Sequence, residues 1–215
     1  MQLPLTNEAL PEVIWLDSAE STNTALRELV SERAALGGSV PHGTLVVTPN
    51  QTAGRGRQGR GWETPPDTAL ASSLLLRPGG GLGEGALGVS WIPLLAGSAI
   101  TRALQPLFSG DGGIGDDGIS NINDEDRQPL RVGVKWPNDV HVRDEEDAMA
   151  GRPGAKLCGI LCEILPGGEV IVGFGINLLL QDWQLPTERA GSVLACGGET
   201  YGAETLADPL GAALA

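Results

Sequence analysis

The chain has 215 residues, of which 41% are hydrophobic, and a formal net charge of −13. This length suits one domain with a substantial core, or two small ones. The acidity argues against a general nucleic-acid-binding protein, which needs a basic face to meet phosphates. The chain shows neither a run of 18 apolar residues nor a basic start followed by an apolar stretch, so we expect no membrane partner and no signal peptide.

The first half of the chain alternates short apolar runs with helical patterns. The run Val13–Asp17 predicts a strand, and Ser21–Leu36 has apolar residues at helical spacing behind small polar capping candidates. Gly43–Thr48 predicts a β-branched strand, and Ala69–Leu76 a second, buried one. Gly85–Phe108 is apolar almost all round, which indicates a helix packed against a sheet.

Two loose segments interrupt the second half. Residues Ser109–Gln128 are rich in acids and glycines, which predicts a disordered acidic insertion. Leu130–Val142 predicts a strand interrupted by turn-forming residues, and the polar residues 144–154 predict a second loop insertion. Two further strands, within residues 155–180, follow with a tight hairpin signal between them. Since helices and strands do not alternate regularly, we predict an α+β domain with a largely antiparallel, mixed sheet flanked by helices.

The cysteines and histidines form no recognisable metal or triad pattern. Cys158 and Cys162 are spaced neither as C-x-x-C nor near a histidine pair, and Cys196 is the third cysteine. An odd number of cysteines without a secretory signal is typical of the reducing cytoplasm. His42 and His141 lack partners for a zinc site or a Ser-His-Asp arrangement. We therefore expect a cytoplasmic protein with buried structural cysteines and no metal site.

The segment GRGRQGRGW, Gly54–Trp62, concentrates arginines on a flexible backbone in an otherwise acidic chain. It formally matches G-x-G-x-x-G, but prolines and a strand follow where a dinucleotide-binding fold needs a helix. It also lacks the Gly-Lys-Ser/Thr of a phosphate-binding P-loop. An RNA-binding Arg-Gly segment and a solvated loop without a role remain alternatives. We favour a loop that closes over an anion, because glycine allows close approach and arginine holds phosphate or carboxylate with two hydrogen bonds.

Lys135 stands at the end of an apolar strand, immediately before a turn. Such a lysine can simply extend into solvent. Beside an anion-closing loop, it becomes a candidate point charge for a phosphate.

Together these motifs resemble the catalytic domain of biotin protein ligases, over about residues 13–195. The resemblance rests on five segments in the family's order: STN (Ser21–Asn23), QTAGRGRQGRGW (Gln51–Trp62), KWPND (Lys135–Asp139), KLCGILCE (Lys156–Glu163) and GFGIN (Gly173–Asn177). It implies a fold of the class II synthetase and biotin–lipoate ligase type.

The resemblance also implies an activity and a set of partners. Biotin and Mg-ATP would form biotinyl-5′-AMP and pyrophosphate, and a lysine of a biotin carboxyl carrier protein would then accept the biotin. ATP, biotin and Mg²⁺ are the implied cofactors.

The same resemblance assigns the site residues. Lys135 and Arg57 would be catalytic. Biotin or biotinyl-AMP would contact Ser21, Thr22, Asn23, Gln51, Gly54, Arg55, Gly56, Arg57, Trp62, Lys135, Gly159 and Asn177. ATP or the adenylate would contact Arg60, Asn138, Lys156, Asn177 and Trp183.

The sequence departs from the family at both ends. We expect residues 1–215 to be one catalytic domain without the family's small C-terminal β domain and without an N-terminal helix-turn-helix, which disfavours a repressor role. A lipoate or octanoate protein ligase or transferase remains the nearest alternative. A non-catalytic biotin or nucleotide binder is an alternative of another class.

Overall fold

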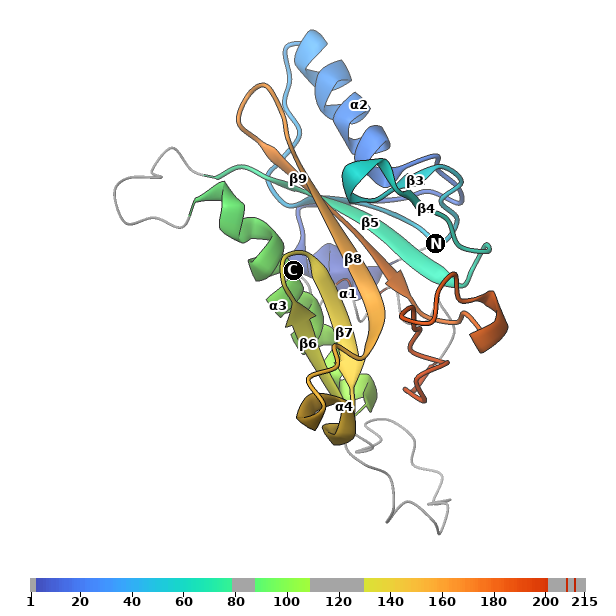
Figure 1. The fold of residues 1–215 in the computed structure, drawn as a ribbon. Coiled ribbons are helices and arrows are strands. Elements are labelled where there is room, and N and C mark those ends of the chain that lie inside the picture. Colours follow the sequence, from blue (N-terminus) through green and yellow to red (C-terminus); the bar gives the residue numbers. More distant parts are fainter. Residues whose placement is uncertain (1–2, 79–87, 109–129, 201–207, 209–210, 212–215) are drawn as a thin grey trace.

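The computed structural model describes residues 3–78, 88–108 and 130–200, together with residues 208 and 211. Within them, a seven-stranded sheet has the order β1-β2-β5-β9-β8-β7-β6 (Figure 1). Its strands are β1 (Glu12–Trp15), β2 (Thr44–Thr48), β5 (Ala69–Leu76), β6 (Arg131–Lys135), β7 (Asp139–Arg143), β8 (Ala155–Ile164) and β9 (Val170–Asn177). Strands β1 and β2 pair in parallel, and the other neighbours are antiparallel. The predicted α+β class with a largely antiparallel, mixed sheet is confirmed.

Two long helices, α2 (Thr22–Ala35) and α3 (Ile92–Leu104), pack on opposite faces of this sheet. The reason is strand alternation, since successive side chains of β5 point to opposite faces. Leu75 lies in one buried cluster with Leu26 of α2, whereas Leu70 lies in a second buried cluster with Ile100 of α3. Helix α3 covers β6, β7 and β8, and α2 covers β2, β5 and β9. The face of the sheet on which α2 packs is called the α2 face below. On this face, much of the area over β7 and β8 is left for other segments to cover.

The remaining elements are short. They are α1 (Pro4–Ala9), the hairpin β3 (Gly54–Arg55) and β4 (Gly61–Trp62), α4 (Glu145–Met149), and the 3₁₀ turns η1 (Arg57–Gly59), η2 (Val89–Trp91), η3 (Gln105–Phe108) and η5 (Asp182–Gln184). The described residues include no helix with the length and apolar character needed to cross a membrane.

Three sequence-based expectations need adjustment. The strand expected over Leu130–Val142 is a hairpin of β6 and β7, because the turn residues reverse the chain. Residues 144–154 contain α4, whose first turn is capped by Asp144, with its carboxylate accepting a hydrogen bond from the Asp147 amide. The helix expected from Gly85 begins as an α-helix only at Ile92, with Pro93 in its first turn, where proline is tolerated. The expected insertion at 109–128 lies outside the described residues.

The cysteine prediction holds in part. All three thiols are free, and Cys158 is buried, while Cys162 and Cys196 are half-buried. Burial raises the pKa of the Cys162 thiol to about 11, which keeps it protonated and unreactive at neutral pH.

Candidate active site

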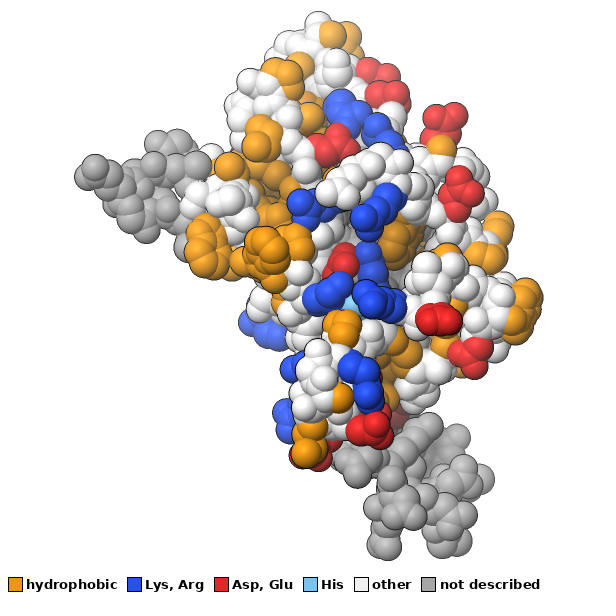
Figure 2. Space-filling model, viewed as in Figure 1, with side chains coloured by type: hydrophobic (Ala, Val, Ile, Leu, Met, Phe, Trp, Pro, Cys, Tyr) orange, Lys and Arg blue, Asp and Glu red, His pale blue; other side chains and the backbone are white. Residues whose placement is uncertain are grey.

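A cavity of about 440 Å³ lies on the α2 face, between the start of α2, the segment 51–62 and strands β7 to β9. This volume is typical of sites for small ligands. Lysine and arginine side chains gather over the middle of this face (Figure 2). The lining residues are Ser21, Thr22, Asn23, Gln51, Arg55, Gly56, Arg57, Gln58, Arg60, Gly61, Trp62, Trp136, Pro137, Asn138, Asp139, Lys156, Gly159, Ile160, Leu161, Gly173, Phe174 and Gly175.

Three strand glycines keep the floor of the cavity flat. Gly159 of β8 pairs directly with Gly175 of β9, and the Trp62 ring lies across both. A Cβ atom on Gly175 would lie 2.7 Å from the Trp62 ring, and one on Gly159 would lie 3.2 Å from it. A Cβ on Gly173 would lie 2.1 Å from the Asn23 side chain. Any side chain at these positions would fill space that the indole or a ligand needs.

One end of the cavity is a neutral hydrogen-bonding corner at the start of α2. The Thr22 amide donates to Gln51 Oε1 at 2.9 Å, and this contact ties the start of the helix to the loop. The buried Ser73 hydroxyl of β5 lies 2.6 Å from Asn23 Oδ1 and donates to it. Asn23 Nδ2 in turn donates to Glu163 Oε1 at 2.9 Å. The polar groups of this corner are therefore fixed in place before any ligand arrives.

The arginine loop is attached at two points, one beside the sheet at Asn138 and one at helix α2. The Arg57 guanidinium donates to Asn138 Oδ1 at 3.0 Å, and Asn138 Nδ2 donates to the Ile160 carbonyl at 2.8 Å. Arg55 donates to the Thr24 hydroxyl at 2.7 Å and lies 4.0 Å from Glu163. These exposed contacts are individually weak. The loop can therefore exchange them for contacts to an anion.

Lys156 of β8 is the cation nearest the glycine floor. Its Nζ lies 2.7 Å from Asp139 Oδ1 and 5.6 Å from the centre of the Trp62 ring. A β-bulge directs it there: Val140 pairs with Cys158 and His141 pairs with Lys156, so Leu157 has no partner on β7. Leu157 joins the core with Cys158, and Lys156 returns to the face that Gly159 occupies. Bulges next to active sites commonly re-aim a side chain in this way.

The electrostatics of the cavity favour an anionic ligand. Among the described residues that line it, the cations Arg55, Arg57, Arg60 and Lys156 face one carboxylate, that of Asp139. Burial acts to raise the pKa of Asp139, but its interactions with His141 and Lys156 outweigh burial, so the pKa is lowered. Asp139 is therefore ionised at neutral pH, and it balances only part of the positive charge.

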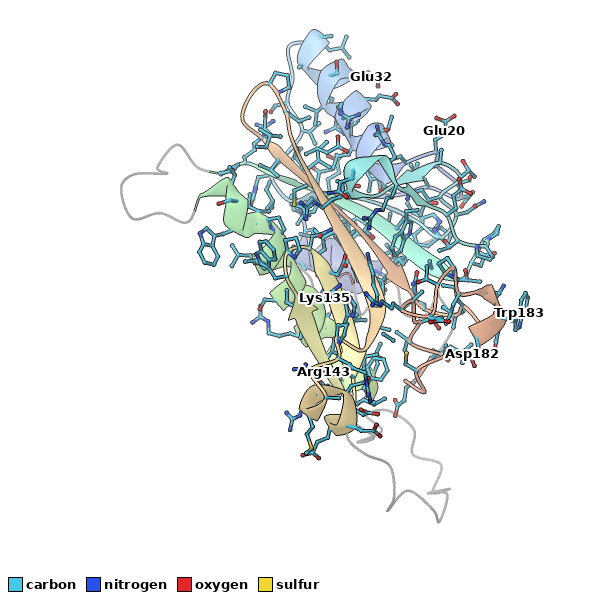
Figure 3. All side chains as sticks on the ribbon, viewed as in Figure 1. Glu20, Glu32, Lys135, Arg143, Asp182 and Trp183 are labelled. Carbon is cyan, nitrogen blue, oxygen red and sulfur yellow. The ribbon has the colours of Figure 1, made fainter. Side chains whose placement is uncertain are left out.

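Most of the residues expected to bind biotin or the adenylate line this cavity, but four do not. Lys135 is exposed at the end of the edge strand β6, where it pairs with Asp139 and so lies one strand further out (Figure 3). Asn177 is buried and donates to the Gly191 carbonyl at 2.8 Å. Trp183 is 82% exposed and projects outward from η5 (Figure 3). Gly54 packs beneath the loop, with no room for a Cβ beside the Trp62 carbonyl and Gln51.

This placement distinguishes the two lysines of the chain, and the catalytic role expected of Lys135 stays a prediction. The lysine that reaches the glycine floor is Lys156, which had been expected to contact ATP, and not Lys135, which had been expected to be catalytic. The chain contains only these two lysines. The strand alternation that would place Lys156 on the opposite face is reversed by the bulge, and a bulge leaves no pattern in the sequence alone.

Sequence reasoning also missed several lining residues. Gly173, Gly175 and Asp139 stood inside quoted motifs without an assigned role. The glycines carried a signal, because glycine inside an apolar strand indicates a close approach. The role of Asp139 depends on Lys156 and could not be read from spacing.

The described residues contain no group of three or more histidine, cysteine, aspartate or glutamate side chains that could hold a metal ion. Asp139 is the one carboxylate among the described lining residues, and Lys156 already occupies it.

Comparison with known proteins gives consistent matches. The model of the biotin/lipoate A/B protein ligase family matches residues 15–178. The biotin–[acetyl-CoA-carboxylase] ligase of Mycobacterium tuberculosis is 31% identical over 163 residues, which are 76% of this chain and 49% of that protein. The bifunctional ligase/repressor BirA of Bacillus spizizenii is 31% identical over 180 residues, or 82% of this chain and 43% of that protein. The chain thus spans about half the length of these relatives, or less.

A solved structure extends the likeness to the fold. The biotin protein ligase from Aquifex aeolicus in complex with biotin and ATP is 26% identical, with a TM-score of 0.63. The match covers 94% of this chain and 68% of that one.

Proposed function

The chain belongs to the biotin/lipoate A/B protein ligase family, and we infer from this and from its cavity that it acts as a biotin protein ligase. We propose that it forms biotinyl-5′-AMP from biotin and ATP. It then transfers biotin to a lysine of a biotin carboxyl carrier protein in the cytoplasm. The family match, the biotin ligases among its relatives and a neighbour with biotin and ATP bound support this proposal.

One observation carries the proposal. The cavity joins a neutral hydrogen-bonding corner to a flat glycine floor and a cluster of four cations. Biotin has matching parts: a ureido ring that needs neutral donors and acceptors, an apolar body, and a carboxylate. In this arrangement Ser21, Thr22 and Gln51 would meet the ring. Lys156 would meet the carboxylate and the α-phosphate.

Adenylation brings two anions together, so charge screening is its main requirement. A carboxylate oxygen of biotin attacks the α-phosphorus of ATP, the bond from that phosphorus to the bridging oxygen breaks, and pyrophosphate leaves with the electron pair. Lys156 would neutralise charge on the reacting oxygens. Arg55, Arg57 and Arg60 would close over the product and exclude water, which would hydrolyse the mixed anhydride.

Transfer needs an unprotonated amine. The carrier lysine attacks the acyl carbon, the bond to the phosphate oxygen breaks, AMP leaves, and the amine loses its extra proton to solvent.

Mg²⁺ enters this scheme with ATP, as part of the substrate. It neutralises phosphate charge, and Mg²⁺ is commonly bound through substrate phosphates with only one or two protein carboxylates. Asp139 could bind this Mg²⁺ only if its ion pair with Lys156 were broken.

The function is tested by biotin-dependent exchange of pyrophosphate into ATP, using the 215-residue chain. We expect exchange with biotin and little with lipoate or octanoate. Exchange with lipoate or octanoate in place of biotin would assign the chain to the other branch of its family. Biotin binding by calorimetry without any exchange would reduce the chain to a binder.

Replacing Arg57 with glycine is expected to let biotinyl-5′-AMP escape before transfer. Arg57 attaches the loop to Asn138, in the turn before β7, so its loss frees the loop to open. The measurement is biotin labelling of a mixture of the carrier protein and an unrelated protein. We expect labelling to spread to the unrelated protein. Labelling that stays confined to the carrier would show that Arg57 does not retain the adenylate.

A further inference from the structure

His141 of β7 is a buried polar group that the proposed chemistry does not use. Its side chain is 4% exposed, and it does not line the cavity. Nδ1 lies 3.2 Å from the Gly154 carbonyl oxygen, which can accept a hydrogen bond. Nε2 is buried and has no hydrogen-bond partner among the described residues. A buried ring nitrogen without a partner costs free energy, so its presence beside a reactive site calls for an explanation.

The direction of Nε2 gives that explanation. Asp139 and His141 are two residues apart on β7 and therefore share a face. The bulge that re-aims Lys156 also makes it the cross-strand partner of His141. Asp139 thus lies between two nitrogen groups: Oδ1 is 2.7 Å from Lys156 Nζ, and Oδ2 is 3.9 Å from His141 Nε2. On β6, the residue paired with His141 is Gly133, which brings no side chain.

Both ring nitrogens of His141 face oxygens that only accept hydrogen bonds. A hydrogen on Nε2 would attract the Asp139 carboxylate, whereas a lone pair there would repel it. A contact with Asp139 therefore requires a form of the ring that carries a hydrogen on Nε2. At 3.9 Å this group does not yet bond to Asp139, and a movement of about 1 Å would bring it into range.

We propose that His141 is a positioning residue that takes over Asp139 when Lys156 turns to its anionic ligand. The inference rests on the proposed adenylation. In the ligand-free chain, Lys156 is shared with Asp139. Once carboxylate and phosphate oxygens arrive, the ammonium must divide its three hydrogens, and Asp139 becomes a poorly compensated anion. The imidazole N–H replaces the lost partner, so Asp139 stays in place and continues to orient Lys156.

A spectroscopic experiment tests the contact without relying on activity. The chain has two histidines, so long-range ¹H–¹⁵N correlation spectra contain two ring systems, and the His42→Gln variant assigns them. We expect His141 Nε2 to carry a hydrogen, and its signal to move in the Asp139→Asn variant. The proposal would be overturned if Nε2 carried no hydrogen, or if its signal did not move in the Asp139→Asn variant.

Kinetics then test the positioning role. His141→Leu is expected to lower kcat for biotin-dependent pyrophosphate exchange about tenfold, the usual effect of one charge-assisted hydrogen bond, with little change in KM. His141→Gln should restore much of the rate, because its amide N–H can reach the same carboxylate. Val142→Ala is the matched control. It removes buried methyl groups from the opposite face of β7, where it destabilises the strand without approaching Asp139, and should leave exchange unchanged.

The decisive comparison combines variants. If His141 acts through Asp139, His141→Leu should have almost no further effect once Asp139→Asn is present. An equal tenfold loss in both backgrounds, or none in either, would contradict the proposal. Absence of exchange in the unchanged chain would instead contradict the proposed function, and the spectra would then decide the His141–Asp139 contact by themselves.

Discussion

Replacing Lys156 with methionine is expected to lower biotin-dependent pyrophosphate exchange by about 10²–10³-fold, the usual cost of one lost electrostatic donor in an active site. Methionine keeps much of the side chain's length and apolar contact with Trp62 but removes the charge. The interaction at stake is large, since a charge pair about 4 Å apart at an effective dielectric near 20 is worth roughly 4 kcal/mol. Because the effect lies in the transition state, kcat should fall with kcat/KM.

The variant Lys135→Met separates the two lysines of the chain. Lys135 lies on the edge strand outside the cavity, so we expect its loss to cost less than about tenfold, by the weak coupling of exposed charges. A full loss in Lys135→Met, with near-normal exchange in Lys156→Met, would restore the assignment made from the motif and refute the one made from geometry. Equal stability of the two variants, measured by thermal unfolding, is the required control.

Replacing Gly175 with valine is expected to weaken biotin binding by about 100-fold. A Cβ at this position would lie 2.7 Å from the Trp62 ring, and the branched methyl groups would project further into the cavity. Overpacking of this kind typically costs 1–3 kcal/mol, and about 1.4 kcal/mol corresponds to a tenfold change in affinity. Calorimetric titration with biotin measures the change directly.

Gly133→Val is the matched control for this prediction. Gly133 is also a strand glycine, but no atom of the described residues lies within 4 Å of its would-be Cβ, so the added side chain meets none of them. We expect biotin affinity close to that of the unchanged chain. If Gly175→Val bound biotin as tightly as Gly133→Val does, the ligand would not lie on the glycine floor.

The sequence by itself predicted most of the local elements and a class of ligand. Apolar runs and helical spacing are local signals, which is why α2, β2, β5 and the hairpin of β8 and β9 were predicted close to their observed bounds. Arginines alternating with glycines are also a local signal; they predicted an anion-binding loop, and this loop lines the cavity. Helix α4 was missed because five residues carry too little periodicity, although its cap residue Asp144 was present to be read.

Only the tertiary structure decided which cation reaches the floor. Lys135 and Lys156 both stand in strands within quoted motifs, and nothing local distinguishes them. The difference arises from pairing between β7 and β8, where one unpaired residue, Leu157, reverses the alternation and turns Lys156 toward Asp139. The same pairing brings His141 beside them. Register is a relation between segments and depends on which strands meet, so the positions of Lys156, Asp139 and His141 could be known only once the sheet was assembled.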